Sequence, residues 1–161
     1  MARALGAAAH GPSVSHRRRE LVDSGCTDRE RRMTRILAGL LGLYYVALGA
    51  VMLWDPLAWY KATPGVTHTG PFNPHFVIDV ALAFVASGAL WSAAAMLARH
   101  RAGLALGAAL WPALHAAFHV FGWLGHGLPQ GPALWAELLG VVLVAAIGTA
   151  LAIHVLRSQI N

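Results

Sequence analysis

The chain has 161 residues, of which 57% are hydrophobic and only 12% are charged. Soluble domains carry about a quarter charged residues, so this composition excludes an ordinary soluble domain and favours a membrane protein. The single cysteine, Cys26, excludes an intrachain disulfide. The formal net charge of +5 arises from arginines before the first apolar run, and we therefore do not expect nucleic acid to be a partner.

Residues 1–34 differ in composition from the rest of the chain. They are rich in arginine, contain Ser, Gly and Pro, and show no sustained apolar period. Such segments cannot bury enough apolar surface to fold alone, so we predict a disordered cytoplasmic tail. A second interpretation stays open, because Met33 directly precedes an apolar run and resembles a natural start. The residues before Met33 would then be a misassigned extension.

Four apolar stretches follow the tail, at residues 36–54, 75–97, 103–125 and 133–156. A bilayer core about 30 Å thick needs around 20 helical residues, so each stretch predicts a transmembrane helix. Short links between the last three favour antiparallel neighbours. We predict an all-α, four-transmembrane-helix bundle over residues 35–157. Small residues let membrane helices approach closely, and the spans carry Gly39, Gly42, Gly103, Gly107, Gly140 and Gly148.

The positive charges predict an orientation for this bundle. Of the twelve Lys and Arg residues, all except Lys61 fall on one side of a four-span arrangement. The positive-inside rule places that side in the cytoplasm. We therefore expect a multi-pass protein of the bacterial inner (plasma) membrane, with both termini cytoplasmic and with residues 55–74 and 126–132 outside.

Ionisable residues inside the spans are the main functional signal. His75 and Asp79 share a helix face at i, i+4, as do His115 and His119. Counted from the outer membrane surface at about 1.5 Å per residue, Asp79 and His119 lie at nearly one depth with Glu137. We expect these side chains to converge in an outward-opening polar cavity.

The residue types suit two kinds of ligand. Imidazole and carboxylate groups suit Zn, Fe, Mn or Cu, whereas haem fits less well because no second matched histidine pair is evident. They also suit the polar head of a small lipophile. The metal candidates are His75, Asp79, His115, His119 and Glu137, and the ligand-binding candidates add Trp111 and Tyr44 to these five. Catalytic residues cannot be assigned, and the sequence decides neither for nor against an enzyme.

Three segments carry a resemblance to known proteins: GLYYVALGAVMLWDPLAWY, TGPFNPHFVIDVALAF and WPALHAAFHVFGW. They resemble small four-helix bacterial inner-membrane proteins of unknown function, and through them the DoxX-like superfamily, over about residues 33–156. The resemblance implies the four-helix fold and a link to quinone or thiol redox systems. The absence of cysteine from the spans speaks against a dithiol role.

Two hypotheses follow from these patterns. The first is an integral membrane protein whose outward-facing His/Asp/Glu cluster binds a metal ion or a small lipophilic ligand such as a quinone, with a link to redox chemistry. The alternative is a non-catalytic accessory or partner subunit whose polar cluster only fixes helix register. The expected partners are the lipid bilayer together with a membrane protein or a second copy of the chain.

Overall fold

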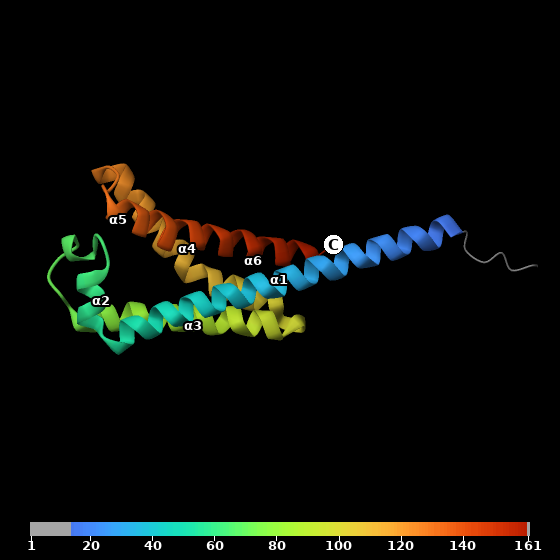
Figure 1. The fold of residues 1–161 in the computed structure, drawn as a ribbon, viewed down its shortest axis with the longest axis horizontal. Coiled ribbons are helices and arrows are strands. Elements are labelled where there is room, and N and C mark those ends of the chain that lie inside the picture. Colours follow the sequence, from blue (N-terminus) through green and yellow to red (C-terminus); the bar gives the residue numbers. More distant parts are fainter. Residues whose placement is uncertain (1–13, 161) are drawn as a thin grey trace, which may run out of the picture. The chain divides into compact units, whose positions relative to one another are not determined.

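The computed structural model describes the backbone of residues 14–160 and the side chains of residues 28–160. In this described part the chain is all α and contains four long apolar helical segments (Figure 1). They are α1 (Val14–Trp54), α3 (Pro74–Met96), α4 (Arg101–His126), and a last segment made of α5 (Pro132–Trp135), η3 (Ala136–Leu143) and α6 (Val144–Ile160). Each is long and apolar enough to cross a membrane. The predicted four-helix bundle is confirmed.

The chain divides into two units, Met1–Met33 and Thr34–Asn161. Helix α1 begins at Val14 and extends from the first unit into the second. The predicted disordered tail falls almost entirely in the first unit. Residues 1–13 lie outside the described residues, and so do the side chains up to residue 27. The tail stays a prediction, and the four packed helices belong to the second unit.

Helix α3 begins and ends at polar contacts that satisfy its free backbone groups. The side chain of Asn73 accepts hydrogen bonds from the backbone N–H groups of His75 and Phe76, and Pro74 occupies the first turn. At the other end, Arg101 Nε donates to the carbonyl of Ala94 at 2.9 Å, and Arg35 Nε donates to that of Ala95 at 3.3 Å. Cations stabilise the terminal carbonyls of a helix, so these arginines hold one end of the bundle together.

Helices α1 and α3 approach each other through glycine. A Cβ atom built at Gly88 of α3 would lie 2.6 Å from the backbone nitrogen of Val46 and 2.8 Å from the carbonyl oxygen of Gly42. A Cβ atom built at Gly49 would lie 2.7 Å from the carbonyl oxygen of Ala81. Small residues allow this backbone contact, which supplies van der Waals attraction where lipid weakens the hydrophobic drive.

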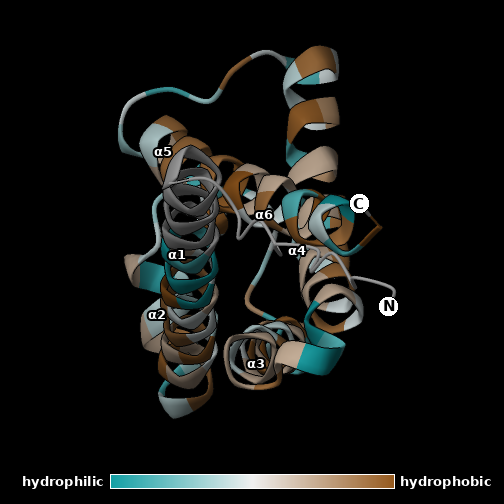
Figure 2. Ribbon diagram, turned by 90° about the vertical axis from the view of Figure 1, so that its right-hand side faces the viewer, coloured by the Kyte–Doolittle hydropathy of each residue, from teal (hydrophilic) through white to brown (hydrophobic). Residues whose placement is uncertain are grey.

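The remaining helices pack in sequence order, α3 against α4 and α4 against both η3 and α6. Alanine and aromatic side chains make up much of the core, and Trp91 and Met52 are its largest fully buried side chains. Large apolar side chains are instead exposed along the outside of the helices, among them Leu43, Leu110, Leu114 and Phe118, and hydrophobic residues recur along the ribbons in Figure 2. A helix that is apolar on its outer face suits a lipid environment.

The segment between α1 and α3 is more ordered than the sequence predicts. It contains α2 (Pro56–Ala62), capped by the side chain of Asp55, and the 3₁₀ turn η1 (Val66–His68). Tyr60 donates to the carbonyl of Gly70 and packs against Phe72. These contacts fold the segment over the bundle end that carries the candidate site.

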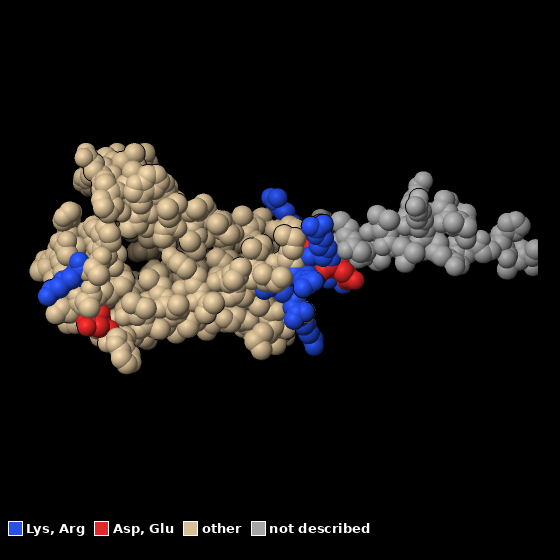
Figure 3. Space-filling view, in the orientation of Figure 1, with Lys and Arg blue, Asp and Glu red and all other residues tan. Residues whose placement is uncertain are grey.

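Basic residues of the second unit gather at the opposite end. Arg35 and Arg101 contact the last carbonyls of α3, and Arg157 lies in the last turn of α6. Lys61 stands apart from them at the end of α2. Figure 3 shows this uneven distribution of Lys and Arg between the two ends of the surface.

Candidate functional site

A carboxylate, an imidazole and an indole meet between α4 and η3. Oxygen Oε2 of Glu137 accepts a hydrogen bond from Nε1 of Trp123 at 2.7 Å and lies 3.0 Å from Nδ1 of His119. His119 and Trp123 lie one turn apart on α4, and Glu137 lies in the first turn of η3. The side chains of His119 and Glu137 are 23% and 22% exposed. The cluster is therefore sheltered but still reachable from outside.

Glu137 belongs to a helical stretch of unusual geometry. The eight residues of η3 form a π-helix between two α-helical segments. π-Helical turns are rare and occur frequently at functional sites. Within η3 the carbonyl of Gly140 accepts a hydrogen bond of 2.7 Å from the hydroxyl of Tyr44. This bond ties α1 to η3 one turn beyond Glu137.

A row of aromatic rings extends from the cluster into the core. The ring of His115 stacks on Trp111 with centroids 4.8 Å apart and 11° between the planes, and lies edge-on to His119 at 4.9 Å. Phe84 of α3 meets the edge of Trp111 at 4.7 Å and stacks on Tyr45 at 5.7 Å. Ring pairs at these distances attract each other, so the row forms an aromatic wall beside the cluster.

The turn that precedes α3 approaches the cluster at a single glycine, Gly65. Gly65 has a φ of +88°, and a Cβ atom built there would lie 3.1 Å from Cβ of Ala133 and 3.7 Å from Oε1 of Glu137. A positive φ is strained for residues with a side chain, so glycine both permits this turn and leaves room beside the carboxylate.

His75 and Asp79 do not join this cluster. They face each other, with Nδ1 of His75 3.5 Å from Oδ2 of Asp79, and their side chains are 86% and 60% exposed. The sequence places Asp79 at about the depth of the cluster, but depth along a helix does not fix the direction of a side chain. The buried face of α3 carries Val77, Ala81 and Phe84, and Asp79 points away from it.

The prediction that all five metal candidates converge in one cavity is therefore wrong. His115, His119 and Glu137 lie near one another, whereas His75 and Asp79 form a separate exposed pair. Among the residues that the structure describes, no group of three or more His, Cys, Asp or Glu is arranged to hold a metal ion. The donor set fits a hydrogen-bonding site better than a coordination site.

Trp123 and Gly65 make contacts in the cluster, although neither is among the candidate residues named from the sequence. Trp123 continues the four-residue spacing of Trp111, His115 and His119, and this spacing was the available signal. No sequence signal places Gly65 beside Glu137, because that contact joins two segments far apart in the chain.

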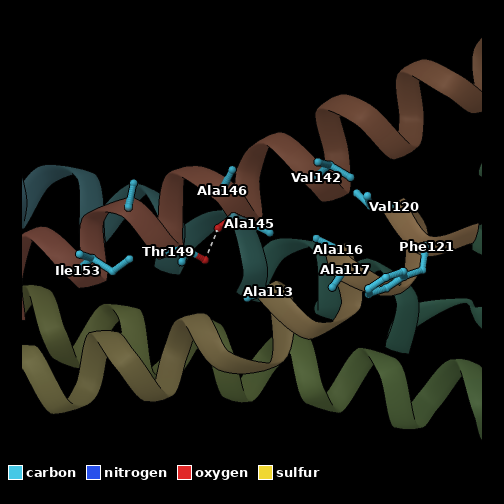
Figure 4. A pocket seen from close by; sticks show the side chains of 11 residues that line it. Ala113, Ala116, Ala117, Val120, Phe121, Val142, Ala145, Ala146, Thr149 and Ile153 are labelled. Carbon is cyan, nitrogen blue, oxygen red and sulfur yellow. Dashed lines mark hydrogen bonds between the residues drawn. The ribbon is translucent and has the colours of Figure 1, made fainter. Parts of the chain in front are cut away.

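A separate apolar groove runs along the seam between α4 and α6 (Figure 4). Its volume is about 520 Å³, and small residues such as Ala113, Ala117 and Ala146 line it. The hydroxyl of Thr149 donates to the carbonyl of Ala145 inside its own helix, so it offers no free proton to an occupant. The groove suits apolar chains and lacks the polar groups of the Glu137 cluster.

No model of a known protein family matches this chain, and no curated protein or solved structure matches it either. The length and hydropathy of its helices show a multi-pass integral membrane protein with four candidate spans.

Proposed function

We propose that this protein binds a small lipophilic molecule with a flat, hydrogen-bonding head, of the quinone class, at the cluster of His119, Trp123 and Glu137. The observation that carries the proposal is the meeting of these three groups beside the stacked rings of Trp111 and His115. The head would lie against the ring wall and bond to the cluster, and the tail would remain among the apolar helices.

The energetic argument starts from the cost of ionisable groups inside a span. Such groups are unfavourable by several kcal/mol unless they face protein or water, and they usually mark function. Here two of them, His119 and Glu137, stay about one-fifth exposed instead of being sealed in the core. Small-molecule sites combine mostly apolar walls with a few convergent polar groups, which is the composition found here.

We propose the bacterial plasma membrane as the location, with both termini in the cytoplasm. The gathering of arginines at the end of the bundle opposite Lys61 supports this orientation. The cluster would then lie toward the outer face. A relation to the DoxX-like superfamily, whose members are linked to quinone systems, is part of the same hypothesis.

Cysteine labelling tests the orientation. In a Cys26→Ser background, Thr67→Cys places a thiol in the exposed turn η1, and Gln159→Cys places one near the end of α6. A membrane-impermeant maleimide added to intact cells should label only the first, and lysed cells should be labelled at both. Labelling of Gln159→Cys in intact cells would show the opposite orientation and contradict the proposal.

Ligand binding tests the site itself. The probe is a decyl-substituted 1,4-benzoquinone, titrated into protein in lipid nanodiscs while tryptophan fluorescence is recorded, because Trp111 and Trp123 line the site. We expect saturable quenching in the native protein. His119→Gln removes one ring from the aromatic wall and should weaken binding of the benzoquinone about tenfold, equivalent to about 1.4 kcal/mol. His75→Gln is the matched control, since His75 is outside the cluster, and should leave binding unchanged.

The alternative function is that of an accessory subunit whose cluster is purely structural. One observation favours it. Oε2 of Glu137 already contacts two groups of α4, so the cluster can link α4 to η3 without a ligand. In that case His119→Gln and Glu137→Gln would lower the unfolding temperature without any saturable quenching by the probe. Saturable quenching that His119→Gln weakens at unchanged stability would exclude this alternative.

A further inference from the structure

The contact between Trp123 and Glu137 fixes the roles of the atoms around it. An indole N–H can only donate a hydrogen bond, so Oε2 of Glu137 is the acceptor in the 2.7 Å contact with Nε1 of Trp123. A carboxylate oxygen has two lone pairs. The same oxygen can therefore accept a second bond from His119, whose Nδ1 lies 3.0 Å away.

This arrangement selects one tautomer of His119. The nitrogen that carries the proton in a neutral imidazole is set by the hydrogen bond of its partner atom. Because Nδ1 faces a carboxylate that is an acceptor toward Trp123, Nδ1 carries the proton and donates it. Nε2 is then left with a lone pair and no proton. The side chain of His119 is 23% exposed, so a ligand can reach this ring.

We infer that the site selects a ligand head that donates a hydrogen bond, such as a phenol or the hydroquinone form of a quinone, by accepting its O–H at Nε2 of His119. This inference rests on the proposed function and adds the chemical class of the head. A quinone carbonyl only accepts hydrogen bonds, so it has no partner at Nε2. Trp123 and Glu137 act as positioning residues, because they set the tautomer without touching the hydroxyl group.

The rings beside His119 do not compete for its nitrogen atoms. His115 lies edge-on to His119 with centroids 4.9 Å apart, and Phe118 lies edge-on to it at 6.0 Å. Both contacts are T-shaped, and neither is a hydrogen bond to a ring nitrogen. The flat pair of Trp111 and His115 lies one turn away, where an aromatic head bonded to His119 can stack.

Two probes that differ in a single proton donor test the inference. They are 4-decylphenol and its methyl ether, each titrated into the native protein in nanodiscs. One net hydrogen bond predicts that the phenol binds roughly two- to tenfold more tightly than the ether. Equal binding of the two probes would overturn the inference but leave the proposed function intact. Saturable binding of neither probe would overturn the inference, and the proposed function would fall with it if the benzoquinone titration also showed no saturable quenching.

Substitutions test whether the preference for the phenol over its ether depends on Nε2 of His119. His119→Phe keeps a ring and removes Nε2, so the two probes should bind alike, which also corrects for any difference in their partition into lipid. His75→Phe is the matched control and should preserve the preference. Trp123→Phe removes one of the two contacts that hold the carboxylate of Glu137 beside His119 and should reduce the preference without abolishing binding. A preference that survives His119→Phe would contradict the assignment.

The tautomer can be measured independently of any probe. In ¹⁵N spectra of histidine-labelled protein at alkaline pH, His119, assigned by its loss in His119→Phe, should show a protonated Nδ1 and an unprotonated Nε2. The opposite tautomer would overturn the inference even if the phenol bound more tightly.

Discussion

Replacement of Gly88 by alanine should separate α1 from α3. A Cβ atom at this position would lie 2.6 Å from the backbone nitrogen of Val46 and 2.8 Å from the carbonyl oxygen of Gly42. Both neighbours are backbone atoms, which cannot rotate away as a side chain can. Ordinary van der Waals contact begins at 3.4 Å, so the helices must move apart by a large fraction of an ångström.

The magnitude follows from the contacts that this movement loosens. A gap of 0.5–1 Å forfeits a quarter to a half of the attraction of each atom pair, and the α1–α3 interface extends from Gly42 to Gly49. Inserting a methylene into a packed interior typically costs about 1–3 kcal/mol. We therefore expect Gly88→Ala to lower the free energy of unfolding by about 2 kcal/mol.

The assay is unfolding by sodium dodecyl sulfate in mixed micelles, followed by circular dichroism. Gly39→Ala is the matched control, because no atom lies within 4 Å of a Cβ built at Gly39. Alanine is favoured over glycine in helices, so the control should be neutral or slightly stabilising. Equal effects of the two substitutions would refute the close α1–α3 packing.

Three further predictions concern the site. Gly65→Ala places a side chain at φ +88° beside Ala133, and we expect about 1–2 kcal/mol lower stability by thermal unfolding; an unchanged melting temperature would contradict this. Tyr44→Phe removes the bond to Gly140 and should cost about 0.6 kcal/mol in the detergent assay, with no loss if that bond is absent. Trp123→Phe removes the indole whose N–H bonds to Glu137. The tryptophan band of the ultraviolet resonance Raman spectrum should therefore lose its hydrogen-bonded component and shift toward the position of an unbonded indole. An unaltered spectrum would contradict the bond.

The sequence predicts the helices well because a span needs only length and apolar composition. The stretch predicted at residues 75–97 corresponds to α3 (Pro74–Met96), and the stretch at 103–125 to α4 (Arg101–His126). The cap at Asn73 depends on contacts within one turn, and such local features are the kind that a sequence pattern can predict.

The candidate site is less predictable because it depends on rotation as well as depth. Residue counting predicts similar depths for Asp79 and His119, but only His119 faces the interior cluster. The apolar pattern of α3 holds part of this information: Val77, Ala81 and Phe84 define its buried face, and Asp79 lies off that face. Neither the π-helical geometry around Glu137 nor the approach of Gly65 leaves a local pattern, since both depend on packing between distant segments.

The glycines of the spans also show that packing between distant segments cannot be predicted from a local pattern. The sequence predicts close approach at Gly42, and the structure confirms it, but Gly88 and Gly49 make equally close contacts and were not singled out. At Gly39 and Gly103 a Cβ atom would meet nothing within 4 Å. A glycine in a span therefore permits close packing without showing where a neighbouring helix lies.

Photo-crosslinking tests the central claim most directly. A 4-decylphenol carrying a diazirine on its ring is photolysed with the protein in nanodiscs, and labelled peptides are mapped by mass spectrometry. The proposed site predicts labels on His119, Trp123 and the residues around Glu137, which excess unlabelled 4-decylphenol removes. Labels confined to residues that line the apolar groove, such as Ala113, Ala117 and Ala146, or labels that excess phenol does not displace, would contradict it.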